Sequence, residues 1–595
     1  MDTDITILYG SQTGNAEDMA KRIGYRAKSL GYSVLVEAMD DFPLKTLTKP
    51  RTIVFVCSTT GHGQEPENMK NFYNFIRRRD LPSGCLAKLR FTVYGLGDSS
   101  YAKFNYVSKI LFKRLKECGA QPIQELVIGD EQHPNGCDGT IYPGLAELWH
   151  KLGNAQLEMD FVADHSLPYR SYDVQLHQPG DIPRSCDIFS RDYVTRYDIK
   201  SAVCTANERI TPESHFQDTR LLCLTTEELI DYEPGDVCTI LPANSEENVH
   251  QLLNILDLKA DQTFSLKKRD SNYMINYLYD FVPAGLTVYE LVKYYLDIQS
   301  VPRRSFFEFL WPFSDNDLEK DKLKEFASTE GQEEMYEYCI LPKRSILEVL
   351  LDFPRTVKNV TFDIIFDLIP PIKPRSFSIA SALIMHPQEV HLIVGVVRYR
   401  TRLRKIREGL CSNFLAKLRP TQSPLDSSPG SRVNFFIKRS SFKLPLRGET
   451  PILMIGPGLG IAPFRGFLEQ RSTVENLQKN NYLYFGCRFR NADFYFREEL
   501  EGYVEKDILR LKVAFSREEP KQYVQDIILA DSDDIKRLIM VEKAFIYVAG
   551  NSKLPEDVRV ILGKILTDES ESSSKSKESF IADLEARGII NYDCW

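Results

Sequence analysis

The sequence predicts a multidomain α/β protein, and three observations carry that prediction. Residues 4–160 alternate short apolar runs with amphipathic runs at helical spacing, as in a doubly wound parallel sheet. From about residue 191 the chain changes to short strands typical of a β-barrel, and from Pro451 the strand–helix alternation returns. A chain of 595 residues, 43% hydrophobic and 27% charged, is long enough for about three to four domains.

The first alternation is the most regular part of the chain. Its apolar runs are bounded by Gly, Ser, Asp and Thr, which favour turns. The predicted strands are Ile5–Tyr9, Val34–Glu37, Ile53–Cys57, Phe91–Tyr94 and Ile123–Ile128, and helices are predicted over Ala16–Leu30, Met69–Arg79 and Lys103–Cys118. A sheet of this kind places its ligand at the carboxyl ends of its strands.

The middle of the chain is less regular. Residues 161–190 are rich in Pro, Asp, Ser and His, which predicts a linker. A helical, aromatic-rich stretch at about 244–350 interrupts the barrel strands and is interpreted as an insertion. The predicted barrel strands are Tyr193–Asp198, Thr219–Leu224, Val237–Leu241, 361–366, 375–380 and 390–399.

Composition excludes several classes of protein. No run approaches the roughly 18 apolar residues that a membrane-spanning helix needs, and the acidic N-terminus does not resemble a signal peptide. The net charge of −8 makes nucleic acid a poor partner. The twelve cysteines form no Cys-x-x-Cys pair, which favours a reduced, cytoplasmic chain without a structural metal.

Three loops of the first domain carry polar and glycine residues where predicted strands end. The hydroxyl-rich loop Ser11–Ala16 lies between a strand and a helix, so its amides and hydroxyls can hold a phosphomonoester. Glycines in Thr59–Gly63 and Leu96–Asn105 allow close approach of a flat ring, on which Tyr101 can stack.

Two further groups of residues indicate a second cofactor and a nucleotide. Arg375 offers a fork of donors for a pyrophosphate, and Phe377 offers a stacking face near the turn Gly409–Ser412. The glycine-rich turn Gly456–Pro463 follows a strand, as a dinucleotide-binding turn should. Ser516, Arg517 and Lys521 suit a 2′-phosphate, since an NAD site would place a carboxylate there.

The first domain resembles flavodoxin, and the order of all these motifs resembles the diflavin reductase family across essentially the whole chain. The resemblance is strongest to the cytosolic branch of that family that serves iron–sulfur cluster assembly. It implies FMN, FAD and NADPH as cofactors, with domains at 1–160 (flavodoxin-like), 161–190 (linker), 191–445 (ferredoxin-reductase-like FAD barrel with its insertion) and 446–595 (NADPH-binding).

The resemblance also assigns residues to each cofactor. The residues implied for FMN are Ser11, Gln12, Thr13, Gly14, Asn15, Ala16, Thr59, Thr60, Gly61, His62, Leu96, Gly97, Asp98, Ser99, Ser100, Tyr101, Ala102, Lys103, Phe104, Asn105, Asp130 and Glu131. Those implied for FAD are Arg344, Arg375, Ser376, Phe377, Ser378, Gly409, Leu410, Cys411, Ser412 and Trp595. Those implied for NADPH are Gly458, Leu459, Ser516, Arg517, Lys521, Gln522, Tyr523, Val524 and Gln525. Ser378, Asp593 and Trp595 are expected to assist hydride transfer, with Trp595 covering the FAD ring.

Three positions depart from the family pattern. Leu459 replaces a usual Thr, which costs one neutral hydrogen bond of about 0.5–1.5 kcal/mol. Ala549 replaces a Cys near the hydride path, and Thr60 replaces a stacking aromatic. None of the three substitutions removes a cofactor.

The resemblance implies transfer of electrons from NADPH through FAD and FMN to a one-electron acceptor, for which it suggests the iron–sulfur protein anamorsin. A haem protein such as a cytochrome is the alternative acceptor. A third interpretation makes the chain a flavin-bound scaffold or signalling protein.

Overall fold

The computed structural model describes residues 4–61, 63–101, 103–153, 170–185, 187–269, 273–275, 278–401, 404–421, 430–473, 480–566 and 574–595. The chain forms two compact units. The first comprises Met1–Ser190, Asn244–Ile372 and Arg400–Lys405, and the second comprises Arg191–Ala243, Lys373–Tyr399 and Ile406–Trp595. No helix among these described ranges is long and apolar enough to cross a membrane.

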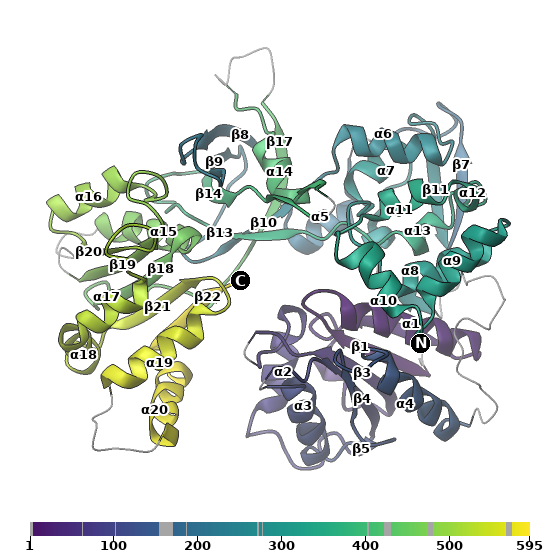
Figure 1. The fold of residues 1–595 in the computed structure, drawn as a ribbon, viewed down its shortest axis with the longest axis horizontal. Helices are drawn as coiled ribbons and strands as arrows, with labels where there is room; N and C mark the ends of the chain where they lie inside the picture. Colours follow the sequence, from purple (N-terminus) through teal and green to yellow (C-terminus); the bar gives the residue numbers. More distant parts are fainter. Residues whose placement is uncertain are drawn as a thin grey trace. The chain divides into compact units, whose positions relative to one another are not determined.

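The first unit contains the N-terminal parallel sheet. Its strands are β1 (Ile5–Gly10), β2 (Val34–Ala38), β3 (Arg51–Ser58), β4 (Leu89–Gly97), β5 (Gln121–Pro122) and β6 (Val127–Asp130). The order is β2-β1-β3-β4, and both β5 and β6 pair with β4 in parallel. Helices α1 (Asn15–Ser29) and α4 (Asp138–Lys151) cover one face, and α2 (Lys70–Arg77) and α3 (Tyr106–Glu117) cover the other (Figure 1). All three cofactor loops therefore follow β1, β3 and β4 at one edge.

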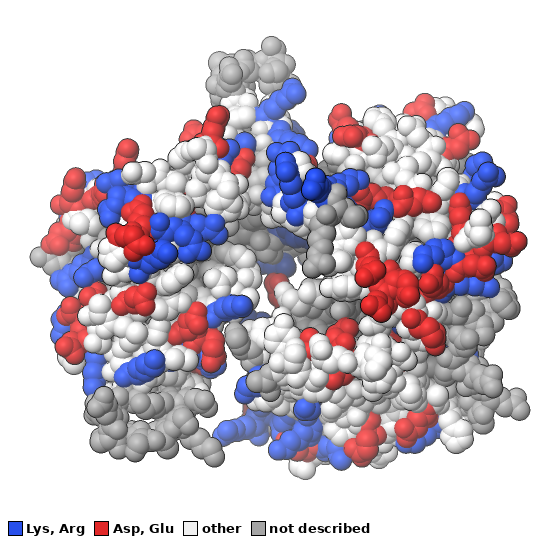
Figure 2. Space-filling view, viewed as in Figure 1, with Lys and Arg blue, Asp and Glu red and all other residues white. Residues whose placement is uncertain are grey.

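The predicted insertion forms the rest of this unit. Its helices are α6 (Glu246–Ile255), α7 (Val288–Tyr294), α8 (Arg304–Leu310), α9 (Asp317–Ala327), α10 (Gln332–Met335), α11 (Ile346–Asp352), α12 (Pro354–Val357) and α13 (Ile365–Leu368), with a π-helical turn at Tyr336–Ile340. Capping boxes start α7 at Thr287 and α11 at Ser345, because each hydroxyl accepts from a Glu amide three residues on. On the face shown, acidic side chains gather over α9 and α10, with basic ones between them (Figure 2).

Two strands of the insertion complete the unit. β11 (Thr263–Lys268) pairs antiparallel with β7 (Tyr172–His177), which lies within the predicted linker 161–190. β12 (Tyr273–Ile275) adds to the N-terminal sheet in parallel beside β2, with Tyr273 opposite Val34. The composition of these segments did not predict either strand pair.

Four charged side chains connect the N-terminal sheet to the insertion, and we call them the ionic joint: Arg22, Asp138, Arg304 and Glu308. Arg22 Nε donates to Glu308 Oε2 at 2.9 Å, and Arg22 Nη1 lies 3.3 Å from Asp138 Oδ2. Arg304 also pairs with Asp138. The guanidinium groups of both arginines are buried, so the charges are removed from water but paired. Burial raises the pKa of Glu308, whereas its pairing with Arg22 opposes that shift.

The second unit contains an antiparallel barrel. Its strands are β8 (Lys200–Arg209), β9 (Thr219–Thr225), β10 (Val237–Leu241), β13 (Arg375–Ser378), β14 (Glu389–Gly395) and β17 (Arg432–Lys438), in the order β13-β10-β17-β8-β9-β14. A bridge between Ile379 and Leu392 joins the two ends of this sheet and closes it. The barrel region also carries α5 (Arg191–Tyr197) and α14 (Leu410–Ala416), and the short strands β15 (Arg398–Arg400) and β16 (Ile406–Glu408) lie between β14 and α14 in the chain.

The C-terminal part of this unit is a five-stranded parallel sheet in the order β20-β19-β18-β21-β22. Its strands are β18 (Ile452–Pro457), β19 (Asn481–Cys487), β20 (Arg510–Phe515), β21 (Phe545–Gly550) and β22 (Ile590–Cys594). Its helices are α15 (Ile461–Ser472), α16 (Arg497–Glu505), α17 (Val524–Ala530), α18 (Ser532–Met540), α19 (Leu554–Leu566) and α20 (Ser574–Ala586).

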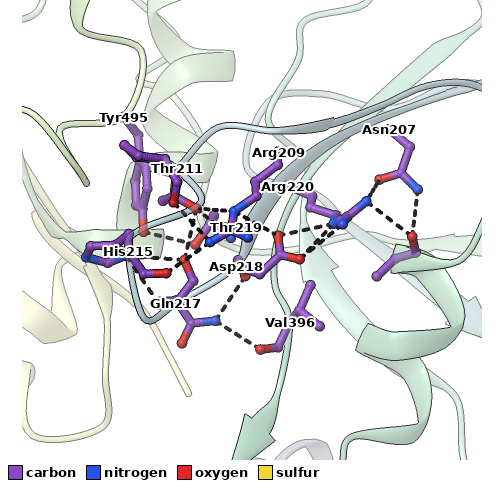
Figure 3. A network of polar contacts seen from close by, with 12 residues as sticks. Asn207, Arg209, Thr211, His215, Gln217, Asp218, Thr219, Arg220, Val396 and Tyr495 are labelled. Carbon is purple, nitrogen blue, oxygen red and sulfur yellow. Dashed lines mark hydrogen bonds and ion pairs between the residues drawn. The ribbon is translucent and has the colours of Figure 1, made fainter.

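An apolar contact fuses the barrel to this sheet, and we call it the aromatic joint: Phe442, Phe464, Phe467 and Tyr547. The rings of Phe467 and Tyr547 have centroids 5.1 Å apart, and Phe442 lies 5.2 Å from Tyr547. The barrel residues Ala380 and Ile393 belong to the same buried core. Polar bonds support this contact, including one of 3.1 Å between Thr219 and Tyr495 in the network of Figure 3.

Two predicted strands are wrong. Tyr193–Asp198 contains β-branched and aromatic residues, but Arg191–Tyr197 forms helix α5. Tyr193 and Tyr197 lie one helical turn apart, and their ring centroids are separated by 4.9 Å. The apolar run 361–366 contributes to turns and to helix α13. Short, fully buried apolar runs carry no periodicity that separates strand from helix.

Candidate functional site

The loop Ser11–Ala16 turns from β1 into α1 and is held from two sides. Ser11 Oγ accepts from the Gly14 amide at 3.0 Å, and the Ser11 amide donates to Asn68 Oδ1 at 2.8 Å. Gly14 is the N-cap of α1 with φ of +96°, a conformation that glycine adopts without strain. The first-turn amides of a 15-residue helix therefore face the point where a phosphate can be held.

The second loop follows β3 and forms a tight turn. Thr60 pairs with Gln64 through two backbone bonds of 2.9 Å. Thr59 Oγ1 accepts from the Val107 amide at 3.3 Å, which ties this loop to the start of α3. Two of the residues predicted for FMN, His62 and Ala102, lie outside the described residues.

The third loop, from Leu96 to Asn105, is fixed to the end of β6. Asp130 accepts from the Ser99 amide at 2.9 Å, and the Glu131 amide donates to the Gly97 carbonyl. Asn105 is fully buried and donates to the Gly129 carbonyl at 2.9 Å, so it positions the loop, and its assignment to FMN stays a prediction. In contrast, the Tyr101 side chain is 66% exposed, as a stacking residue must be before its ligand binds.

The remaining residues of that loop are turn residues. Asp98 accepts from Ser100, and this hydrogen bond holds the pKa of the Asp98 carboxyl below its ordinary value. Lys103 lies over the ring of Tyr106, with Nζ 4.9 Å from the ring centroid, and the Phe104 amide donates to the Tyr101 carbonyl.

One residue against the phosphate loop was missed by the sequence analysis. Arg303, the N-cap residue of α8, donates to Asn15 Oδ1 and to the Thr13 carbonyl. It is separated from Asn15 by 288 positions in the chain. No local pattern around Arg303 could have indicated this contact.

The residues predicted for FAD in the barrel lie on β13 and at the start of α14. β13 pairs with β10, with Phe377 opposite Cys238. Among the described residues Arg375 donates only to the backbone carbonyls of Lys373 and Pro374, so its guanidinium carries no carboxylate partner there. That leaves a fork of donors for a pyrophosphate.

The turn at Gly409 leads directly into a helix. Helix α14 begins at Leu410, with Gly409 as the N-cap, so Cys411 and Ser412 lie in its first turn. Ser412 Oγ accepts from the Val397 amide at 3.0 Å, which fixes the turn to the preceding strand segment.

Arg344 lies in the insertion. Its guanidinium carbon is 4.2 Å from the centroid of the Tyr338 ring, and its Nη1 pairs with Asp352. The arginine therefore has partners within the insertion, and its assignment to FAD stays a prediction.

The nucleotide turn follows β18 and leads into α15. Gly460 must be glycine, because a Cβ there would lie 2.0 Å from the Ala549 carbonyl oxygen. This close approach brings the turn against the end of β21. Leu459 packs with the core that contains the aromatic joint, so its side chain serves packing.

The residues predicted for the 2′-phosphate lie where β20 ends. The Ser516 amide donates to the Cys487 carbonyl at 2.9 Å, and the Arg517 amide donates to the Arg488 carbonyl at 3.1 Å. The side chains of Lys521 and Tyr523 are exposed beyond this point. Gln522 bonds through its amide to Phe515, Gln525 donates to Asp557, and the Val524 side chain is buried.

Of the three residues predicted for hydride transfer, one lies on β13, one on β22 and one directly after β22. Ser378, at the end of β13, donates to Asp593 Oδ2 at 2.6 Å. Asp593 lies on β22 opposite Ala549 of β21, and the Trp595 amide donates to the Gly550 carbonyl at 3.0 Å. The Trp595 side chain is 56% exposed. A barrel strand and the last strand of the nucleotide sheet thus meet at one hydroxyl–carboxylate pair.

Comparisons with known families match three successive parts of the chain. The family described as flavodoxin matches residues 7–141, the FAD binding domain matches residues 202–414, and the oxidoreductase NAD-binding domain matches residues 454–560. These three domains, in this order along the chain, fit FMN, FAD and NADPH as cofactors.

Several proteins are similar to this chain over nearly its whole length. The chain is 38% identical over 607 residues to the NADPH-dependent diflavin oxidoreductase 1 of Xenopus laevis, covering 100% of this chain and 99% of that protein. It is 39% identical to the protein of the same name from Mus musculus, covering 99% of each. The Candida albicans protein of that name is 36% identical, with 100% of both chains covered.

Proposed function

The chain belongs to the diflavin reductase family, and from that premise we propose that it delivers single electrons from NADPH to an iron–sulfur protein of the cytoplasm, anamorsin, in iron–sulfur cluster assembly. When bound, FAD supplies acceptance of a hydride from NADPH and FMN supplies one-electron transfer to the acceptor. A pyridine nucleotide gives two electrons at once and an iron–sulfur cluster takes one, so two flavins suit this task.

The Ser378–Asp593 hydrogen bond is the observation that carries the NADPH-to-FAD half of this proposal. It brings a hydroxyl from the strand predicted to hold the flavin to a carboxylate from the nucleotide sheet, at 2.6 Å. Ser378 can orient a reacting group while Asp593 accepts the hydrogen bond from the Ser378 hydroxyl. Trp595, exposed just beyond, can cover a ring and move aside.

The nucleotide preference is the first test of these roles. We expect Arg517→Ala to raise the KM for NADPH about 10- to 100-fold and to leave that for NADH nearly unchanged, because a charge-assisted bond to the 2′-phosphate is lost. Trp595→Ala should reduce the difference between the KM for NADPH and the KM for NADH. Arg497→Ala, which removes an exposed arginine paired with Glu501, is the matched control. Equal effects of Arg517→Ala on both nucleotides would contradict the 2′-phosphate assignment.

The acceptor is tested by mixing NADPH-reduced protein with oxidised anamorsin under nitrogen in a stopped-flow instrument. We expect rapid bleaching of the cluster bands, and Tyr101→Ala should slow it. Cytochrome c is the parallel acceptor. Fast haem reduction without cluster bleaching would assign a haem protein as the acceptor, and a flavoprotein that NADPH does not bleach would indicate a scaffold.

The linker predicted at 161–190 is the basis for a proposed movement of the flavodoxin domain. We propose that it lets the flavodoxin domain alternate between FAD and the outside acceptor. Shortening the segment outside β7, the strand that pairs with β11, should slow reduction of the acceptor while hydride transfer stays fast. Unchanged acceptor reduction in the shortened chain would exclude this alternation.

A further inference from the structure

Arg303 reaches the phosphate loop from a distant part of the same unit. Its Nη1 donates to Asn15 Oδ1 and its Nη2 donates to the Thr13 carbonyl. A Cβ added to Gly14 would lie 2.9 Å from Nη2, so the guanidinium lies directly against the left-handed glycine that starts α1. One arginine thus contacts three consecutive residues of a loop that fits the FMN phosphate.

The position of Arg303 is fixed by its neighbours. The next residues of α8 also bond to the N-terminal domain: Arg304 to Asp138, Ser305 to Asp18, and Glu308 to Arg22. Asp18 and Arg22 lie on α1, the helix that the phosphate loop begins. Helix α8 is therefore attached along α1 at several points, and its N-cap is held at the N-terminus of α1.

The bond to Asn15 decides which way its carboxamide faces. An amide side chain has an oxygen that only accepts and an NH2 group that only donates. Because Arg303 occupies the Asn15 oxygen, the NH2 group of Asn15 is left to face the anion site. The guanidinium makes no ion pair with a carboxylate in the described part of the chain. Its positive charge therefore adds to the attraction for a phosphate group, which carries a charge of about −1.5 to −2.

We propose that Arg303 is a positioning residue for the FMN phosphate, which orients the Asn15 amide and the Thr13–Asn15 backbone and adds a cation beside the dianion. The inference rests on the assignment of FMN to this domain. It gives the insertion a part in holding a cofactor that the flavodoxin domain was expected to bind by itself.

The test compares FMN with riboflavin, which has the same ring and lacks the phosphate. The full chain, retaining FAD and freed of FMN, is titrated with each flavin while the quenching of flavin fluorescence is followed. We expect Arg303→Ala to weaken FMN binding about tenfold and to leave riboflavin binding unchanged. Arg303→Lys keeps the charge without the two-pronged bond and should lie in between. Lys358→Ala, which removes an exposed cation elsewhere in the insertion, should change neither affinity.

A double-mutant cycle separates positioning from simple attraction. If Arg303 acts through Asn15, the loss caused by Arg303→Ala should fall to about threefold or less in an Asn15→Ala background. Fully additive losses would overturn the positioning role. Unchanged FMN affinity in Arg303→Ala, or equal losses for FMN and riboflavin, would overturn the inference alone. A wild-type chain that binds riboflavin as tightly as FMN would overturn the phosphate assignment as well.

Discussion

The two joints described above connect domains by opposite means. The ionic joint holds the flavodoxin domain to the insertion through two arginines and two carboxylates. The aromatic joint holds the barrel to the nucleotide sheet through four aromatic side chains in one continuous core. All four side chains of the aromatic joint are buried, and in the ionic joint Arg22, Asp138 and Arg304 are buried while Glu308 is partly exposed.

The difference has an energetic meaning. Separation at the ionic joint returns charges to water, and their recovered hydration offsets much of the lost attraction. Separation at the aromatic joint exposes apolar area, at about 25 cal/mol per Å², and nothing offsets it. The flavodoxin domain is therefore joined by contacts that can be exchanged for water, whereas the FAD barrel and the nucleotide sheet behave as one body.

The largest effect is expected at the aromatic joint. Phe467→Ala removes a fully buried ring and should lower the free energy of unfolding by about 3–5 kcal/mol, measured by denaturant titration. Phe489→Ala, at a residue that is 40% exposed, is the control and should lower the free energy of unfolding far less. Barrel and nucleotide sheet should lose structure in one transition. Separate transitions would break the comparison, because the two would then be independent.

A smaller effect is expected at the ionic joint. Glu308→Ala leaves Arg22 with Asp138 as its remaining carboxylate, and should lower the free energy of unfolding of the first unit by about 1–3 kcal/mol. Glu333→Ala, an exposed acid on α10, is the control. Denaturant titration followed by the tryptophan signal measures both. If Glu308→Ala lowered the free energy of unfolding as much as Phe467→Ala does, the two joints would not differ in strength and the comparison would fail.

A third effect depends on pH. Burial raises the pKa of Asp367 to about 6, although Ser171 and Tyr25 donate to its carboxylate. The folded state then binds the proton more tightly than the unfolded state, so this group's contribution to stability is present at low pH and declines as pH rises from about 4 to 6. Asp367→Asn should remove that decline, a change of about 1 kcal/mol between pH 5 and 7. Thermal unfolding at the two pH values measures it, and an unchanged pH profile would contradict the assignment.

The smallest effect is that of salt. Raising the ionic strength from about 0.05 to 0.5 M should increase hydrogen exchange of the α8 amides about threefold, because salt stabilises the separated charges. The amides of α15, which lies at the aromatic joint, should exchange at the same rate in both solutions. Equal acceleration in α8 and α15 would remove the distinction between the joints.

The sequence predicted the parts of the molecule that are specified locally. The loops after β1, β3, β4 and β18 could be located because each follows an apolar run and contains glycines or hydroxyls. Tyr193–Asp198 and 361–366 were assigned to the wrong element, since composition alone favours a strand there.

Local sequence patterns do not predict contacts between residues that are far apart in the chain. The ionic joint and Arg303 connect residues that are more than 100 positions apart in the chain, and each arginine alone resembles an ordinary surface residue. Only the folded chain shows which carboxylate or loop each of them reaches.

The pairing of β12 with β2 has a consequence for work with fragments. β12 belongs to the insertion, yet it occupies the outer edge of the N-terminal sheet beside Val34, Leu35 and Val36. A fragment that ends at residue 160 would carry the apolar strand β2 with its backbone donors and acceptors unpaired. Such an edge is a template for intermolecular strand pairing, so the excised flavodoxin domain should self-associate more readily than the intact chain.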